Sequence, residues 1–513
     1  MRDIVNKSLK LNNDLDRYVE QALEQGRPVK IGWGRAGDER PKDGEFGVMT
    51  HLPEGARVLC LGSLGDCVGA ANRGGTLTLR GDAGSMLGAF HHSGKTVVEK
   101  DVGDKVGFGM KGGEISIQGS TGDESGYSMT GGIILVRGHS GDRLGCGMSG
   151  GSIVVMGSVG SEPGIGMTGG RVIISGSCPP PPDGVEMRSI KKSEISEFSK
   201  LLDPMGLSLN DDALVLEPTG AVSSSFEGTE FFISEGFENI SLYPNEDSLS
   251  DNSPLDHYTL LVQDGADSEG ALLKIPWIMT CETTIGSEKW KGVDSPAIVR
   301  TKSRDNDLLL VGKNEFCDAI DHVGNCSGIV FDITDFPGLN DAEIEGMIIS
   351  LRSRMSGNSI ILLRGRIDRI ERLFRLVMDL DLDGAVVNSA TIGGTRLASS
   401  LPKIGLSAKA MGMSETGKFV MIEVLQQPIA KDLIIAVASG CTALVSPCPD
   451  SDLSAKINEL TVGIRELMRE IGVDRIERIG RRNLRANNFD TAAISGLRLV
   501  GYDRPLKMWL DLR

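Results

Sequence analysis

The chain contains MKGGEISIQGSTGDESGYS (Met110–Ser128), MTGGIILVRGHSGDRLGCG (Met129–Gly147) and MSGGSIVVMGSVGSEPGIG (Met148–Gly166) in direct succession. These segments align without a gap, and glycine recurs in them in steps of 19 residues. The steps extend over Gly55–Gly176 in four tracks: Gly62, Gly81, Gly119, Gly138, Gly157 and Gly176, broken at Lys100; Gly65, Gly84, Gly103, Gly122, Gly141 and Gly160; Gly69, Gly88, Gly107, Gly126, Gly145 and Gly164; Gly75, Gly94, Gly113, Gly132, Gly151 and Gly170. A fixed period of about 20 residues is the signature of a stacked solenoid.

The repeats predict strands. Each has a short alternating run after a glycine pair, such as Glu114–Ile117, and no repeat leaves room for a helix of about ten residues. The turns between strands use glycine because it adopts positive φ without steric cost. Stacked coils pair their backbones with the coils above and below. The sequence therefore predicts a right-handed β-helix of about six 19-residue coils.

A methionine track has the same step: Met110, Met129, Met148 and Met167. Such a track has two interpretations, a ladder that binds a soft metal or a column of thioethers that fills the solenoid. Because no histidine or cysteine track shares the step, the filling role is favoured. We predict no metal site.

The composition limits the classes of protein. The 513-residue chain has 40% hydrophobic and 24% charged residues, which is ordinary for soluble proteins and is enough for two or three domains. Its net charge of −16 argues against a nucleic-acid partner. No membrane-spanning run and no signal peptide is recognised, so a cytoplasmic protein is expected. The nine cysteines include no CxxC pair, which disfavours a disulfide framework or a zinc site.

The pattern divides the chain into four parts. Residues 1–54 form an N-terminal cap segment, in which Asn13–Leu23 is a predicted helix that covers the first coil. Residues 55–178 form the β-helix. Residues 179–206 are a linker with four successive prolines and a predicted helix at Ser193–Leu202. Residues 207–513 form an α/β domain.

In this last part short apolar runs alternate with helices, which is typical of parallel βα units in a barrel or a doubly wound sheet. The predicted strands are Tyr258–Val262, Leu308–Val311, Gly328–Phe331, Ile360–Leu363, Ala385–Val387 and Val420–Val424. The predicted helices are Asp341–Arg354, Ile367–Asp379 and Asp452–Ile471.

Few motifs indicate chemistry directly. No dinucleotide fingerprint, Walker loop or zinc-protease motif lies in the α/β part. The pair His91-His92 lies in a coil, where neighbouring side chains point to opposite faces, so a lining or surface role is favoured over a metal site. An arginine cluster near the end of the chain fits either an acidic or phosphate partner or, more commonly, a solvated face: Arg475, Arg478, Arg481, Arg482 and Arg485.

The repeats resemble a known family. Ser93–Glu99, Val102–Asp104, Met110–Gly113 and Met148–Gly151 are similar to the C-terminal glycine-repeat domain of the glutamate synthase large subunit. The C subunit of formylmethanofuran dehydrogenase has a similar glycine-rich β-helix. The resemblance covers roughly residues 55–176.

The second half resembles, less closely, the flavin-binding synthase barrel of the same family. The matching runs follow the family's order: Phe331–Ile333, Ile360–Arg364, Asp383–Val387, Ile392–Thr395 and Gly463–Gly472. The resemblance implies a degenerate (β/α)8 barrel after the β-helix, which reverses the domain order of the large subunit.

Several functional residues of that family are replaced. Its S-G-H-D-G-G-T-G run corresponds to Ser389–Arg396, its strand lysine falls near Leu363, and its D-G-G run appears as Leu425–Gln427. Leu425 and Gln426 would obstruct a flavin phosphate after the last strands. Cys441 and Cys448 cannot replace the three thiolates of its iron–sulfur cluster. The chain also lacks the N-terminal cysteine of the glutaminase domain.

The remaining candidate cofactor-binding residues are Arg364, Gly393, Gly394, Thr395 and Arg396. Arg364 and Arg396 fit an anion site, but pairing with neighbouring Asp or Glu residues is an equal alternative. No catalytic residue is assigned.

Two hypotheses for function follow. One is a structural or accessory subunit of a glutamate-synthase-related oxidoreductase complex, without a cofactor. The other is an active enzyme with FMN in a modified site. Both imply other protein subunits as partners, and neither excludes a homo-oligomer.

Overall fold

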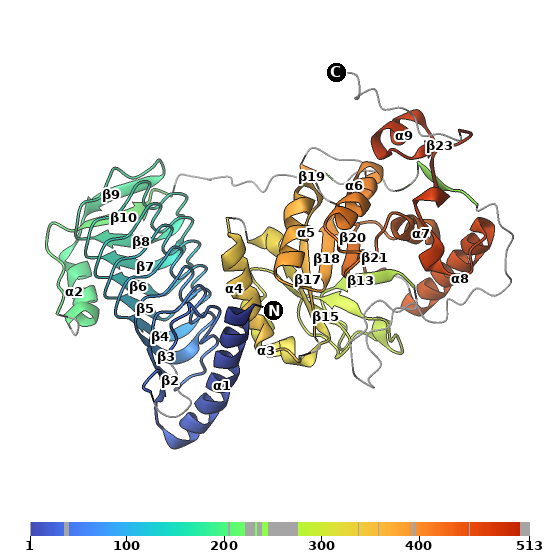
Figure 1. The fold of residues 1–513 in the computed structure, drawn as a ribbon. Coiled ribbons are helices and arrows are strands. Elements are labelled where there is room, and N and C mark those ends of the chain that lie inside the picture. The colour runs from blue at the N-terminus through green and yellow to red at the C-terminus, as the bar shows by residue number, and fades with distance from the viewer. Residues whose placement is uncertain are drawn as a thin grey trace. The chain divides into compact units, whose positions relative to one another are not determined.

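A computed structural model describes residues 2–34, 40–203, 206–220, 231–232, 237, 239–244, 275–336, 338–357, 359–389, 391–392, 397–450 and 452–502 (Figure 1). The chain divides into two compact units. The repeat unit comprises Met1–Glu227 and Leu339–Arg354, and the barrel unit comprises Gly228–Gly338 and Met355–Arg513.

The repeat unit is built on a 10-stranded sheet with the order β1-β2-β3-β4-β5-β6-β7-β8-β10-β9. Its first eight strands run parallel. They are β1 (Val29–Ile31), β2 (Arg57–Leu61), β3 (Arg73–Arg80), β4 (Ser93–Val98), β5 (Glu114–Ile117), β6 (Ile133–Val136), β7 (Ser149–Val155) and β8 (Gly169–Ile174).

The strands from β2 to β8 stack in the register of the sequence repeat. Ile115 lies opposite Thr96 on one neighbour and opposite Ile134 on the other, each 19 residues away. A second ladder of isolated parallel bridges has the same step: Ala83, Val102, Thr121, Ser140 and Val159. Successive repeats therefore lie directly over one another, as the rungs in Figure 1 show.

The interior of the stack is filled by columns of apolar side chains. Two columns come from the strands: Leu77, Ile115, Ile134, Ile153 and Val172; Leu79, Val98, Ile117, Val136, Val155 and Ile174. The methionine track joins the same core, with Met110, Met129 and Met148 fully buried and Met167 at 5% exposure. The prediction that the thioethers fill the interior is confirmed.

The glycine tracks serve two different purposes. In the third track glycine adopts positive φ, as at Gly126 with φ 75°, which agrees with the predicted turns. In the first track the reason is contact between repeats, because a Cβ on Gly81 would lie 1.8 Å from the Gly62 oxygen. The sequence reasoning gave only the turn role of glycine and missed this second reason. Here glycine allows one backbone to approach the next.

Polar side chains add a ladder along the second glycine track. The carboxylate of Asp104 accepts a hydrogen bond from the backbone N–H of Asp123 at 2.8 Å, and Asp123 accepts one from Asp142 at 2.8 Å. A Cβ on Gly122 would lie 1.9 Å from the Asp104 Oδ1, so glycine leaves the space that this carboxylate occupies. Each repeat thus supplies an acceptor to the following one.

Helix α1 (Asp3–Gln25) lies beside the first repeats and extends beyond the predicted Asn13–Leu23. Its Leu15 and Val19 belong to the interior core. The Asn12 amide donates to the Gly47 oxygen at 2.8 Å and accepts from the Met49 N–H at 2.9 Å. These contacts fit the predicted capping role.

The segment predicted as a linker, residues 179–206, contributes to the same unit. It contains β9 (Val185–Ser189) and α2 (Lys192–Leu202), and α2 coincides with the predicted helix. Strand β10 (Leu214–Pro218) pairs antiparallel with β8 and β9. Phe198 and Leu202 of α2 pack on the outer face of the sheet. The sheet therefore does not end at the prolines.

Helix α4 (Asp341–Arg352) follows a barrel strand in sequence but belongs to the repeat unit. Its Glu343 is fully buried and accepts from Lys105 Nζ at 2.9 and 3.0 Å. The α4 capping box, in which Asn340 and Glu343 hold each other's backbone N–H, orients this carboxylate.

The barrel unit contains a closed barrel of eight strands, all parallel. In order they are β13 (Trp277–Cys281), β14 (Ala297–Val299), β15 (Leu308–Val311), β16 (Gly328–Asp332), β17 (Ile360–Arg366), β18 (Gly384–Asn388), β20 (Phe419–Glu423) and β21 (Ala443–Pro447). Of the two predicted alternatives, the barrel is confirmed and the doubly wound sheet is wrong. The predicted strand at Tyr258–Val262 lies outside the described residues.

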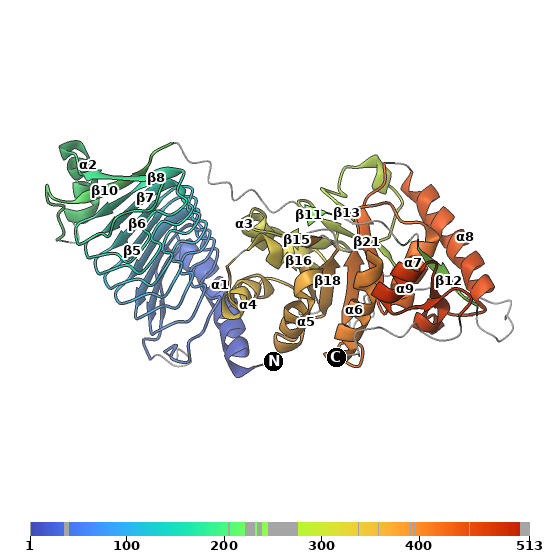
Figure 2. The ribbon, with the colours of Figure 1, turned by 90° about the horizontal axis from the view of Figure 1, so that it is seen from above.

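Helices stand outside the barrel strands, as Figure 2 shows for α5, α6 and α8. The helices of this unit are α3 (Phe316–His322), α5 (Ile370–Asp379), α6 (Leu397–Ala410), α7 (Ala430–Ala438), α8 (Leu453–Ile471) and α9 (Phe489–Ser495). Smaller strands complete it: β11 (Phe231–Phe232), β12 (Ile240–Leu242), β19 (Thr391–Ile392), β22 (Leu484–Ala486) and β23 (Arg498–Leu499). No helix among the described residues has the length and apolarity needed to cross a membrane.

We predict that Gly81→Ala destabilises the repeat unit by about 3 kcal/mol or more, because its Cβ would meet backbone that cannot move aside. Gly147→Ala is the matched control. Gly147 has φ 63° and its Cβ would meet only Ser128 Oγ at 3.7 Å, so only conformational strain of about 1 kcal/mol is expected. Calorimetric unfolding measures both. Equal losses would contradict the contact explanation.

His91 is fully buried and His92 is exposed, which confirms that the pair points to opposite faces. The Asn72 oxygen accepts from the N–H groups of Gly74 and Gly75, so its amide donates to His91 Nε2 at 3.2 Å. His91 Nδ1 then donates to the Gly112 oxygen at 3.0 Å. This network holds a neutral imidazole.

Burial lowers the pKa of His91 to about 4. An unfolded chain binds this proton near pH 6.5, so stability should fall as the pH decreases from about 6.5 to 4. We predict that this residue accounts for a loss of about 2 kcal/mol between pH 7.5 and 5. Denaturant unfolding at both values should show a smaller loss for His91→Gln than for the control His92→Gln. Equal losses of stability in the two variants between pH 7.5 and 5 would contradict the prediction.

Candidate functional site

The carboxyl ends of the eight barrel strands meet at one mouth of the barrel. In barrels of this kind the residues at these ends and in the following loops form the functional site. Charged residues at or soon after these strand ends include Glu282, Arg300, Lys313, Glu315, Asp332, Asp335, Arg364, Arg366 and Glu423.

Arg364 on β17 is the candidate residue that the structure describes most completely. Its Nε donates to Glu423 Oε2 at 2.6 Å and its Nη2 donates to Glu423 Oε1 at 2.9 Å. Its Nη1 donates to Asp332 Oδ2. Asp332 ends the neighbouring β16, and Glu423 ends β20. Arg364 therefore pairs with carboxylates, the second of the two alternatives expected from the sequence.

The ion triad of Asp332, Arg364 and Glu423 is mostly buried, with side-chain exposures of 5%, 16% and 11%. Burial alone would lower the pKa of Arg364, but the hydrogen bonds and charges of Glu423 and Asp332 raise it well above its usual range. Asp332 Oδ1 also accepts from the Thr334 hydroxyl at 2.6 Å. Two carboxylates thus face one guanidinium, which leaves the triad with a net negative charge.

A second cluster of titratable groups follows β14, β15 and β16. Glu315 Oε1 accepts from Arg300 Nη1 at 3.1 Å, while Glu315 Oε2 is buried and no described donor reaches it. Burial raises the pKa of Asp335, and the charges of Asp332 and Glu315 add to this effect. Burial lowers the pKa of Lys313. Sequence reasoning missed this cluster, although acidic residues directly after buried strands are a usable signal.

The helices after the last two strands carry their own anions at their N-termini. Asp432 accepts from the Ile429 N–H at 3.0 Å at the start of α7. Asp452 accepts from the Ser454 N–H at 2.9 Å at the start of α8. In a (β/α)8 barrel these loops and helix ends are the usual phosphate site. Here a carboxylate of the chain accepts from one N–H group at the start of α7 and from two at the start of α8, so a phosphate at these donors would compete with that carboxylate.

The loop after β20 folds over the end of β21, where Gln427 Nε2 donates to the Pro447 oxygen at 2.8 Å. Leu425 is 56% exposed in this loop. The obstruction of a flavin phosphate by Leu425 and Gln426 stays a prediction from the sequence.

The other candidate residues, Gly393, Gly394, Thr395 and Arg396, lie outside the described residues and stay predictions. The preceding Thr391–Ile392 form β19, which pairs with β11. Cys441 and Cys448 lie at opposite ends of β21, which separates them by about 20 Å. Among the described residues, no group of three His, Cys, Asp or Glu side chains is arranged to hold a metal ion.

Comparisons with known proteins concern each half separately. Residues 50–201 match a family model described as the GXGXG motif, which is less than half of the chain. No curated protein matches the chain.

Three similar solved structures are all flavocytochrome b2. One is a variant with benzoylformate, at 13% identity and a TM-score of 0.36. Another variant has 13% identity and a TM-score of 0.35, and the recombinant flavin-binding domain from baker's yeast has 12% and 0.35. Each match covers 48% of this chain and 76% of the other. At such scores these structures carry no argument about the site.

We predict that Glu423→Ala destabilises the barrel unit by about 3–5 kcal/mol, because it leaves a buried guanidinium with one partner. Glu282→Ala is the control, since that side chain is 75% exposed and should change stability by at most about 1 kcal/mol. The triple variant Asp332→Leu/Arg364→Met/Glu423→Leu, which leaves no charge of the triad unpaired, should recover part of the loss. Denaturant unfolding measures all three variants, and a Glu423→Ala loss as small as the control would be inconsistent with a buried triad.

Proposed function

We propose that this chain is a glutamate-synthase-related subunit of an oxidoreductase complex, with a structural or accessory role. The match of residues 50–201 to the GXGXG motif supports the relationship of the first half. The order of the matching runs in the second half supports the relationship of the barrel. Partner subunits are part of this proposal.

In this proposal the repeat unit is a right-handed β-helix that serves as a scaffold. The main sheet and the ladder of isolated bridges are both parallel and share the 19-residue step. Each repeat contributes one segment to each of them, which supports a coiled path of the chain. Stacked coils present long flat faces, which suit the assembly of protein subunits.

The accessory role rests on one observation: charged side chains of the chain itself occupy the barrel mouth. Arg364 is paired on both sides, and carboxylates occupy the helix ends where a flavin phosphate would bind. A phosphate placed there would have to displace these carboxylates and would meet their negative charge.

The alternative is an active FMN-dependent oxidoreductase with a modified site. The second cluster at the mouth favours it, because Asp335 and Lys313 have shifted pKa values and clusters of this kind are common at active sites. In this alternative FMN would need contacts other than the usual phosphate site.

We predict that the purified full-length chain binds FMN weakly, with a Kd above about 1 mM in equilibrium dialysis. Asp452→Ser keeps a capping oxygen but removes the charge, so it should bind FMN more tightly than wild type. Asp450→Ser is the control for a nearby exposed charge. Micromolar binding by the wild-type chain would support the alternative and reject the accessory role.

A further inference from the structure

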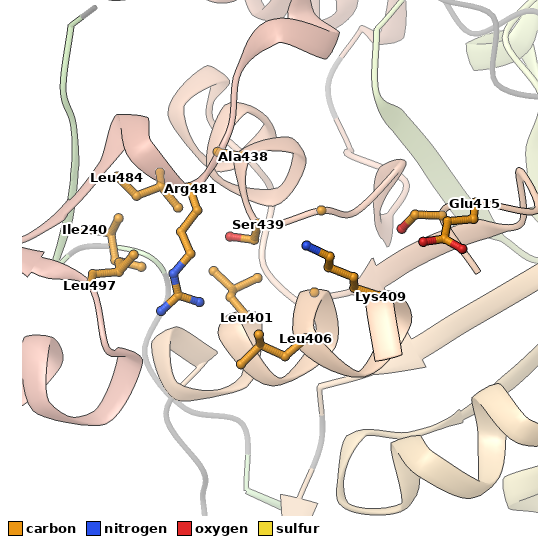
Figure 3. Close-up of a pocket in the computed structure, with 13 residues that line it drawn as sticks. Ile240, Leu401, Leu406, Lys409, Glu415, Ala438, Ser439, Arg481, Leu484 and Leu497 are labelled. Atoms are coloured by element: carbon orange, nitrogen blue, oxygen red, sulfur yellow. The ribbon is translucent and has the colours of Figure 1, made fainter. Parts of the chain in front are cut away.

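A pocket of about 440 Å³ lies in the barrel unit, away from the strand ends of the candidate site (Figure 3). It is formed by α6, by the residues before β20 and β21, and by the segment after α8. Ser414 and Glu415 precede β20, whereas Ser439 and Gly440 precede β21. The pocket is therefore on the side of the barrel opposite the mouth.

The walls of this pocket are apolar. Six aliphatic side chains line it: Ile240, Leu401, Leu406, Ala438, Leu484 and Leu497. Five of them are at most 4% exposed, but Leu406 is 64% exposed at the pocket edge. Pockets of this size and character commonly hold small molecules.

Two solvent-exposed cations line this pocket, as Figure 3 shows. Lys409 comes from α6 and Arg481 from the short helix Arg481–Asn483. Arg481 Nη2 donates to the Ser495 oxygen at 2.7 Å. Among the described residues neither cation forms an ion pair, and burial lowers the pKa of Arg481 with no carboxylate opposing this effect.

The pocket floor is held by a close approach of two elements. A Cβ on Gly405 of α6 would lie 2.4 Å from the Ser439 oxygen at the end of α7. Glycine at this place lets the helices meet without filling the space between them. Glu415 lines the end of the pocket away from Arg481, and Lys409 lies between the two in Figure 3.

We propose that this pocket binds a small carboxylate with an apolar chain. The carboxylate binds Arg481 and Lys409, and the chain lies along the leucine walls. Charge complementarity supports this occupant, because two cations that form no ion pair among the described residues line an apolar pocket with a single carboxylate, Glu415. A polyphosphate would leave those walls against water. The proposal is independent of the accessory or catalytic role of the barrel.

The test is calorimetric titration of the full-length chain with octanoate and, separately, with 1-octanol, its neutral counterpart. Octanoate should bind at least about tenfold more tightly. Arg481→Gln and Lys409→Gln should each weaken octanoate binding by about tenfold and leave octanol binding unchanged. Arg475→Gln, a nearby exposed arginine outside the pocket, is the matched control and should have no effect.

A fourth variant tests where the apolar chain of octanoate lies in the pocket. Leu406→Asp places a negative charge at the pocket edge and should abolish octanoate binding, while unchanged thermal unfolding shows that the fold is intact. Equal affinity for octanoate and octanol would overturn the proposal, as would no octanoate binding at millimolar concentration. Unchanged octanoate affinity in Arg481→Gln and Lys409→Gln would also overturn it.

Discussion

The repeat unit depends on the close approach of successive backbones. A Cβ at the first glycine track would lie within about 2.5 Å of the preceding repeat, so at these positions the repeats approach this closely only because the side chain is missing. The equal step then brings like residues together: methionines over methionines in the core and aspartates over aspartates outside. An insertion of one residue in a strand would turn its buried side chains to the opposite face. The fixed 19-residue length follows from this constraint.

Local repetition explains why the repeat unit was predictable from sequence. Each strand such as Glu114–Ile117 repeats the signal of its neighbour, and the period reinforces the pattern. The barrel strands β15 and β16 were recognised from the apolar runs Leu308–Val311 and Gly328–Phe331. The three-residue β14 is too short to show a period. The second reason for glycine, contact between repeats, appears only when the repeats are stacked in space.

The candidate site was less accessible to sequence reasoning. Arg364 is 32 residues from Asp332 and 59 residues from Glu423, and only closure of the barrel brings the three together. The sequence left its two pairing alternatives equal because pairing depends on this closure. The carboxylates at the starts of α7 and α8 were likewise not assigned from the sequence. Each accepts from N–H donors that other barrels offer to ligands. The guanidinium of Arg364 and these helix starts thus have partners within the chain itself.

The antiparallel strands β10 and β9 have a consequence for the length of the stack. An open rung at β8 would present a full row of backbone donors and acceptors to any other copy of the chain. Strand β10 pairs antiparallel with β8 and so occupies this row of donors and acceptors. The outer strand β9 carries the charged residues Glu186 and Arg188. At the other edge β1 has only three residues and lies beside α1. Growth into filaments is therefore blocked at both edges of a sheet whose internal geometry would otherwise continue without limit.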